Sequence, residues 1–166
     1  RFNRLIYVFF AMGLMVPVSN VTIVKVLRVL NLYNTLTGTI LVCVALIMPL
    51  SVFLYYGFIS GIPKELDEAV RIFVQVIFPL LKPATVTVIM INFLNVWNDF
   101  QIPLYTLPDP DKAVIVQKVY NFFGTYTASW NLVSVTIIYA ILPILVVYLF
   151  GQKYIISGMT AGSVKG

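Results

Sequence analysis

The sequence predicts an all-α fold: a polytopic membrane helical bundle with about four transmembrane helices, a short charged helix on one side and an interfacial helix on the other. Two observations predict this class. The 166 residues are 60% hydrophobic and only 10% charged, whereas soluble domains contain about 25% charged residues. The charges lie between uncharged stretches of about 20 residues, the length that an α-helix needs to cross a bilayer. We therefore expect residues 1–166 to form a single transmembrane domain.

The rare residue types exclude several kinds of site. The sequence contains no histidine and a single cysteine, Cys43, so we expect no zinc site, disulfide framework or histidine-based triad. The net charge is +5, but the basic residues occur singly along the chain. They do not form the basic face that nucleic-acid binding requires. Asp109 and Asp111 lack the pattern of an EF-hand. We expect neither a metal nor a nucleic-acid partner, and a membrane-embedded enzyme would lack a credible nucleophile–base pair.

The first expected span runs from Leu5 to about Val24 and contains no charged residue. Pro17 should kink or end it, because proline cannot continue a helix without a clash. Val24 to Leu32 carries Lys25 and Arg28 among aliphatic residues. This pattern is typical of a short amphipathic helix in the membrane interface.

The second and fourth expected spans are the most uniformly apolar stretches. Thr35 to Phe58 is uncharged and contains Pro49, and Asn131 to Gly151 is uncharged and contains Pro143. A proline inside a span frees a carbonyl that must find another partner, so Pro49 either faces other parts of the protein or simply kinks the helix. The tail from Ser157 is expected to be small, flexible and polar.

The third expected span, from Pro83 to about Leu104, is the polar one. Asn92, Asn95 and Asp99 recur at i, i+3 and i+7, with Asn98 beside them, so one helical face should carry them. A carboxylate in a span usually faces a cavity or a partner. These residues either line a translocation path or outer gate, or bond to neighbouring helices and interfacial water. An ion or proton site at Asp99 would instead suit a channel or an ATP-independent carrier.

The segment from Tyr105 to Trp130 is expected to lie outside the membrane. Leu107 to Asp111 has the proline and aspartate composition of a turn. Its aromatic residues fit a belt at the membrane surface, with stacking on a sugar as an alternative. They are Tyr120, Phe122, Phe123, Tyr126 and Trp130.

The segment Pro63–Ile72 predicts a short helix between two spans. Proline suits the first helical turn, and the acidic residues that follow suit the positive end of the helix dipole. Leu66 and Ala69 belong to an apolar strip. A helix of about 15 Å cannot bury that strip by itself, so it must dock on another protein surface.

The charged segment reads Pro-x-Glu-Leu-x-Glu-Ala from Pro63, and Pro-Leu-x-x-Pro ends it at Pro83. It resembles the cytoplasmic coupling loop of ABC-importer permeases. The resemblance is strongest to the carbohydrate family, typified by the maltose permease, of binding-protein-dependent inner-membrane components. Trp97-Asn98-Asp99-Phe100 and the segment Gly158–Gly166 are also similar to that family. The resembling region covers 63–166, with 63–83 as the coupling loop.

The resemblance implies a permease subunit that is itself non-catalytic and imports a sugar or oligosaccharide. Its partners would be a second permease subunit, two cytoplasmic ATPase subunits and an extracytoplasmic solute-binding protein, in the cytoplasmic membrane of a bacterium or archaeon. The chain lacks the GxxxxGK[ST] signature, so ATP and Mg would bind the ATPase subunits, and we expect no cofactor in this chain. The residues expected to dock on an ATPase subunit are Glu65, Leu66, Glu68, Ala69 and Ile72.

The chain departs from the family pattern in two ways. Family members usually have six spans, so four spans would correspond to the C-terminal part of such a subunit. The family loop usually continues with Asp-Gly-Ala, whereas Ile72 here is followed directly by Phe73. Either the loop is shortened or a segment is missing after Ile72, and we expect the second.

The basic residues predict the orientation of the spans. Seven of them would share one side and four the other, which favours a cytoplasmic location for the charged loop and the C-terminus. The larger group is Arg1, Arg4, Lys64, Arg71, Lys82, Lys153 and Lys165; the smaller group is Lys25, Arg28, Lys112 and Lys118.

Overall fold

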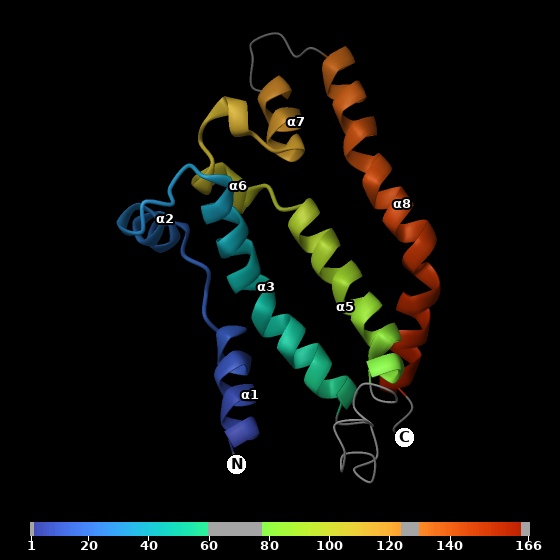
Figure 1. Ribbon diagram of the computed structural model, residues 1–166. Coiled ribbons are helices and arrows are strands. Elements are labelled where there is room, and N and C mark those ends of the chain that lie inside the picture. The colour runs from blue at the N-terminus through green and yellow to red at the C-terminus, as the bar shows by residue number, and fades with distance from the viewer. Residues whose placement is uncertain (1, 60–77, 124–129, 164–166) are drawn as a thin grey trace. The chain divides into compact units, whose positions relative to one another are not determined.

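The computed structural model describes residues 2–59, 78–123 and 130–163 (Figure 1). Every regular element within these ranges is a helix, which confirms the predicted all-α class. The elements are α1 (Phe2–Gly13), α2 (Asn20–Val29), α3 (Leu36–Ile59), α5 (Phe78–Trp97), α6 (Gln101–Thr106), the 3-10 helix η3 (Pro110–Lys112), α7 (Ile115–Phe123) and α8 (Trp130–Ser163).

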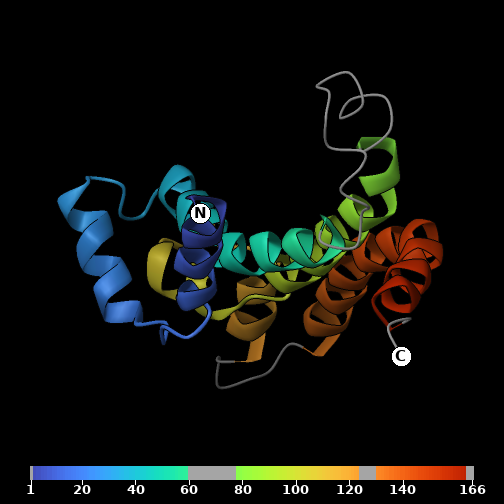
Figure 2. The same ribbon diagram turned by 90° about the horizontal axis from the view of Figure 1, so that it is seen from below.

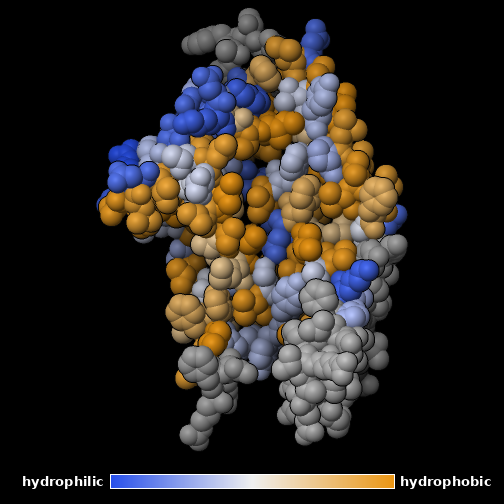
Figure 3. Space-filling model, viewed as in Figure 1, coloured by the Kyte–Doolittle hydropathy of each residue, from blue (hydrophilic) through white to orange (hydrophobic). Residues whose placement is uncertain are grey.

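Within the described ranges, two helices are long and apolar enough to cross a membrane. They are α3, with 24 residues, and the first 23 residues of α8, Trp130–Gln152. Their large aliphatic and aromatic side chains are exposed, such as Ile40 at 60% and Phe150 at 75%, and apolar residues cover much of the face in Figure 3. A soluble core helix would bury these side chains. The second and fourth expected spans are thus confirmed as span-length helices, whereas a total of four is not.

The first expected span is not one helix from Leu5 to Val24, and the expected break at Pro17 is confirmed. α1 ends at Gly13, and α2 begins at Asn20 rather than near Val24. A helix through Pro17 would bring its ring against the carbonyl of Gly13, four residues earlier. The Ser19 hydroxyl then accepts a hydrogen bond from the Thr22 backbone N–H at 3.4 Å and caps the start of α2.

The third expected span is also interrupted. α5 begins at Phe78 instead of Pro83 and ends at Trp97 instead of Leu104, and its apolar stretch Leu81–Trp97 is shorter than a full span. A carboxylate oxygen of Asp99 accepts hydrogen bonds from the backbone N–H groups of Gln101 at 2.8 Å and Ile102 at 3.1 Å. In a continuous helix these N–H groups would donate to the carbonyls four residues earlier. Because the Asp99 carboxylate accepts them instead, α6 starts as a separate helix.

The expected flexible tail from Ser157 is helical instead, since α8 continues to Ser163. No proline follows Pro143 in this stretch, and extending an existing helix costs far less than starting one.

The chain divides into two compact units. Unit 1 comprises Arg1–Val16, Met48–Phe93 and Tyr148–Gly166, and unit 2 comprises Pro17–Ile47 and Leu94–Val147. Close helix approaches hold unit 1 together. The ring of Tyr7 stacks on that of Tyr56 with 3.9 Å between centroids, and a Cβ at Gly13 would lie 3.0 Å from Pro49. Of the two alternatives for Pro49, the one in which it faces protein is therefore confirmed.

Unit 2 is organised around the contact between α2 and α6, which lie side by side (Figure 1, Figure 2). Leu27 of α2 and Ile102 of α6 are buried. The chain leaves α2 through Asn31 and Asn34, both with positive φ, a conformation that asparagine tolerates better than most residues. The Asn34 N–H then donates to the Thr106 carbonyl at 3.1 Å, which fixes the start of α3 against α6.

Candidate functional site

Asn92 links two helices in unit 1. Its side-chain amide Nδ2 donates to the Ser51 hydroxyl of α3 at 2.7 Å. Its Oδ1 is buried and has no hydrogen-bond partner among the described residues. An amide in apolar surroundings that satisfies only its donor retains an acceptor for a further donor. Asn92 therefore bonds to a neighbouring helix, which was one of the two expectations, and its buried Oδ1 has no hydrogen-bond partner among the described residues.

The backbone of α5 explains why this amide meets α3. Buried Ala84 and Val88 lie on α5 eight and four residues before Asn92, so they follow the same helical stripe. Thr87 donates its hydroxyl to the carbonyl of Pro83 at 3.0 Å, so this buried polar side chain is satisfied within α5. The stripe is thus apolar at Ala84 and Val88 and becomes polar at Asn92.

Asn95, Asn98 and Asp99 belong to unit 2. Asn95 and Asn98 are exposed, and Asn98 Nδ2 donates to the Leu94 carbonyl at 2.8 Å. Because α5 ends at Trp97, Asp99 does not continue the helical face of Asn92 and Asn95, and that part of the prediction is wrong. The Asp99 carboxylate instead faces the backbone of α6.

The contact that secures the end of α5 was not predicted from the sequence. The indole Nε1 of Trp97 donates to the Ala140 carbonyl of α8 at 3.0 Å. Ala140 lies three residues before Pro143, in a helix whose hydrogen-bond ladder the proline interrupts nearby. A tryptophan in the motif Trp-Asn-Asp-Phe was the only available signal, and its partner lies 43 residues away.

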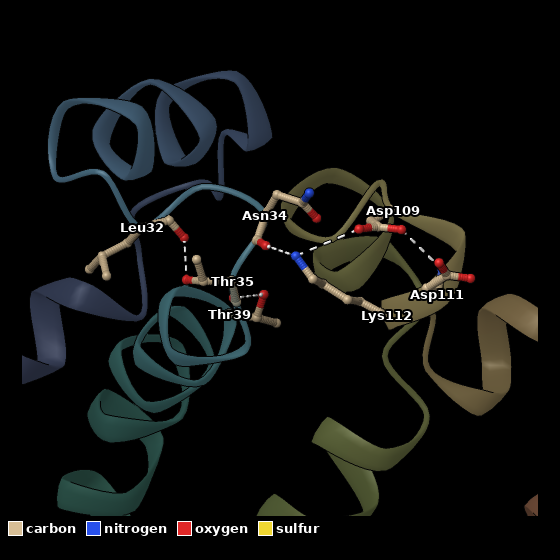
Figure 4. A network of polar contacts seen from close by, with 7 residues as sticks. All are labelled: Leu32, Asn34, Thr35, Thr39, Asp109, Asp111 and Lys112. Carbon is tan, nitrogen blue, oxygen red and sulfur yellow. Dashed lines mark hydrogen bonds and ion pairs between the residues drawn. The ribbon is translucent and has the colours of Figure 1, made fainter.

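A polar network joins the segments beyond the end of α6 to the start of α3 (Figure 4). Lys112 Nζ donates to the Asn34 carbonyl at 2.8 Å and lies 3.6 Å from an Asp109 oxygen. The Asp109 carboxylate also accepts the Asp111 N–H at 3.1 Å, so the expected turn is confirmed. Among the described residues no cluster of three metal-ligating side chains occurs.

The predicted ATPase-docking residues lie outside the described residues, since residues 60–77 are not among them. They are Glu65, Leu66, Glu68, Ala69 and Ile72. The expected discontinuity after Ile72 lies in the same range. Their role and the loop length stay predictions.

Comparison with known proteins identifies the family. The model of the family described as "Binding-protein-dependent transport system inner membrane component" matches residues 1–160. The chain belongs to this family. Among its relatives, the melibiose/raffinose/stachyose import permease protein MelC of Bacillus subtilis is 36% identical over 177 residues, covering 100% of the chain and 64% of MelC. The multiple sugar-binding transport system permease protein MsmG of Streptococcus mutans is 35% identical, covering 98% of the chain and 62% of MsmG.

A third relative in the binding-protein-dependent transport family is the probable starch degradation products permease AmyC of Thermoanaerobacterium thermosulfurigenes, 31% identical over 97% of the chain and 62% of AmyC. The chain thus spans a little under two thirds of the length of these relatives. The alignment with MelC is 177 residues long against the 166 residues of the chain. MelC therefore has residues inside the aligned region that have no counterpart here.

Proposed function

We propose that this chain acts as the transmembrane permease of an ABC importer for a sugar or oligosaccharide. The match of the inner-membrane-component family over residues 1–160 carries the proposal. The printed names of MelC, AmyC and MsmG all refer to saccharides. This chain itself would have no catalytic activity. Two cytoplasmic ATPase subunits would bind ATP and Mg. A second permease subunit and an extracytoplasmic solute-binding protein would complete the importer.

The asparagine amides suit a path for a neutral, hydroxyl-rich substrate. An amide both donates and accepts hydrogen bonds, as a sugar hydroxyl does. Asn92 keeps one buried acceptor without a partner, and the Asn95 and Asn98 side chains are exposed. Asp99 already accepts two backbone hydrogen bonds, so we infer that it shapes the break between α5 and α6, where a path or outer gate can form.

Coupling to ATP hydrolysis is proposed for the segment Pro63–Ile72. Its short amphipathic pattern needs an external surface to cover Leu66 and Ala69, and Glu68 would meet a basic or N–H donor group there. ATP-driven closure of the ATPase pair would move the docked segment and switch access to the path. In this topology the 63–83 loop and the C-terminus are cytoplasmic, on the side with more basic residues.

The direct test is ATP-dependent uptake by the whole complex. The complex is purified through a tag on this chain, reconstituted in proteoliposomes with its solute-binding protein, and offered a panel of labelled mono-, di- and oligosaccharides. We expect ATPase subunits to copurify and at least one sugar to enter only with ATP. Uptake that proceeds without ATP, driven by an ion gradient and lost in Asp99→Asn, would support the carrier or channel alternative instead.

Two groups of variants locate the roles. Glu68→Lys or Ala69→Arg should abolish uptake in inserted complexes, with the ATPase subunits dissociated or hydrolysing ATP without transport. Lys64→Gln, at a variable position of the same motif, is the matched control and should transport normally. Normal uptake with bound ATPase in both Glu68→Lys and Ala69→Arg would remove the coupling role.

Asn92→Leu tests the path separately from coupling. We expect at least a tenfold loss of uptake, because a polar contact of about 1.4 kcal/mol in the transport barrier corresponds to a factor of ten. Ser51→Ala removes the hydroxyl to which Asn92 Nδ2 donates and serves as the control. If both variants lose uptake equally, Asn92 acts through helix packing and does not line the path.

A further inference from the structure

Helix α2 has one face that the protein covers and a wider surface that it leaves open. Leu27 is buried against α6, and Asn20, Ile23 and Val24 on the same side are half-buried. Successive residues of an α-helix are 100° apart, which places the remaining residues on the far side. The α2–α6 contact therefore accounts for only part of the apolar surface of this helix.

The open surface of α2 consists of two parallel stripes. Val26, Val29 and Leu30 form an apolar stripe and are exposed at 51%, 81% and 58%. Lys25 and Arg28 form a basic stripe beside it, with exposed Val21 between them, and both charged side chains are exposed. No acidic residue occurs in α2, so this surface presents two positive charges next to a row of aliphatic side chains.

Neither basic group of α2 is neutralised by a carboxylate of the described residues, and Arg28 has an aromatic contact. The guanidinium carbon of Arg28 lies 4.7 Å from the ring centroid of Tyr33, a cation–π contact that leaves the guanidinium edge open to hydrogen bonding. The single ion pair among the described residues joins Lys112 to Asp109. Lys25 and Arg28 are therefore free of carboxylate partners in that part of the chain.

A short connection ties this surface of α2 to the start of a span-length helix. The span-length helix α3 begins at Leu36, a few residues after α2 ends at Val29. The connection is tight, because the backbone N–H groups of Leu32 and Tyr33 both donate to the Leu27 carbonyl, at 2.8 and 3.2 Å. α2 is thus tied to the level at which α3 enters the bilayer.

We propose that α2 binds acidic phospholipid. In this arrangement Val26, Val29 and Leu30 enter the boundary between headgroups and acyl chains, and Lys25 and Arg28 hold a headgroup phosphate. An apolar stripe beside a basic stripe is the arrangement of helices that lie in the interface plane. Each basic residue near an anionic surface strengthens its attraction roughly fivefold. Together they fasten unit 2 to the leaflet at which α3 begins.

The test uses the purified complex in vesicles of phosphatidylcholine, with or without phosphatidylglycerol. A fluorophore is attached at Val29→Cys in a Cys43→Ala background, and quenching by lipid-borne and water-soluble quenchers is compared. We expect the lipid-borne quencher to dominate at position 29. At Asp111→Cys, in the exposed turn of unit 2, the soluble quencher should dominate.

The headgroup preference tests the basic stripe. Quenching at position 29 by brominated phosphatidylglycerol should exceed that by brominated phosphatidylcholine at least fivefold. Lys25→Gln with Arg28→Gln should reduce this ratio to near one, and added inorganic phosphate should leave it unchanged. Lys118→Gln is the matched control, because that ammonium is already held by the Pro110 carbonyl at 2.6 Å.

Three results would overturn the proposal. Dominant quenching from water at position 29 would mean that α2 faces solvent. Protection from both quenchers would mean that a protein partner covers this surface. A headgroup ratio that survives removal of Lys25 and Arg28 charges would mean that the basic stripe does not select the lipid.

Discussion

Replacing Gly38 with alanine tests the tightest approach in unit 2. Gly38 is buried at the start of α3, and an added Cβ would run into the carbonyl oxygen of Leu32. That oxygen accepts the Thr35 hydroxyl at 2.6 Å, and the Gly38 N–H donates to the same hydroxyl at 3.0 Å. A backbone carbonyl cannot rotate away as a side chain can, so the turn before α3 must open.

The expected size of the effect follows from three contributions. Alanine gains about 1 kcal/mol of helix propensity over glycine. Overpacking costs about 1–3 kcal/mol, and a backbone neighbour favours the upper end of that range. Loss of one or both hydrogen bonds at Thr35 costs about 1 kcal/mol each. Gly38→Ala should therefore lower the free energy of unfolding by about 2–4 kcal/mol.

The assay is reversible unfolding of the purified chain in mixed micelles with increasing SDS, followed by far-ultraviolet circular dichroism. Gly57→Ala is the matched control in the same helix. A Cβ there would meet no atom of the described residues within 4 Å, so that variant should be unchanged or up to about 1 kcal/mol more stable. Equal stability of Gly38→Ala and Gly57→Ala would refute the packing argument.

Three further changes have definite expected outcomes. Gly151→Leu should destabilise the chain by about 1–3 kcal/mol, because the Met90 sulfur fills the space beside Gly151; adding Met90→Ala should recover most of the loss in the same titration, and no recovery would contradict the contact. Thr106→Val should cost about 1 kcal/mol, since the Thr106 hydroxyl lies 2.8 Å from that of Thr39 in a buried pair, and an unchanged titration would argue against that bond. Asp99→Asn keeps an oxygen for capping α6 but removes the charge; transport should change while the complex still assembles, and unaltered uptake of every sugar would leave Asp99 a purely structural cap.

The sequence predicted the break at Pro17, but not the cap at Ser19 or the break after Trp97. Pro17 and Ser19 are a local stop and a local cap, so the end of α1 and the start of α2 follow from neighbouring residues. The break after Trp97 likewise depends on Asp99 and the two N–H groups just after it. Two full spans were expected here because the prediction relied on the length of the uncharged stretches. It gave too little weight to the capping residues within them.

The sequence by itself determined the membrane class, the two longest spans and the family. Each depends on composition or on residues close together in the chain: an uncharged run is apolar whatever it packs against, and the turn around Asp109 forms from its own side-chain and backbone bonds. The motifs from Pro63 to Pro83 likewise stand in consecutive residues, and the match over residues 1–160 agrees with the family that they indicated.

Tertiary structure alone decided which polar groups meet. Asn92 donates a hydrogen bond to Ser51, 41 residues away in the sequence, and Lys112 donates one to the Asn34 carbonyl, 78 residues away. The periodicity of one helix specifies which residues share a face but not which helix that face will contact. The partner is chosen by close packing and by the cost of leaving a buried polar atom without a hydrogen bond, and both depend on all the neighbouring helices at once.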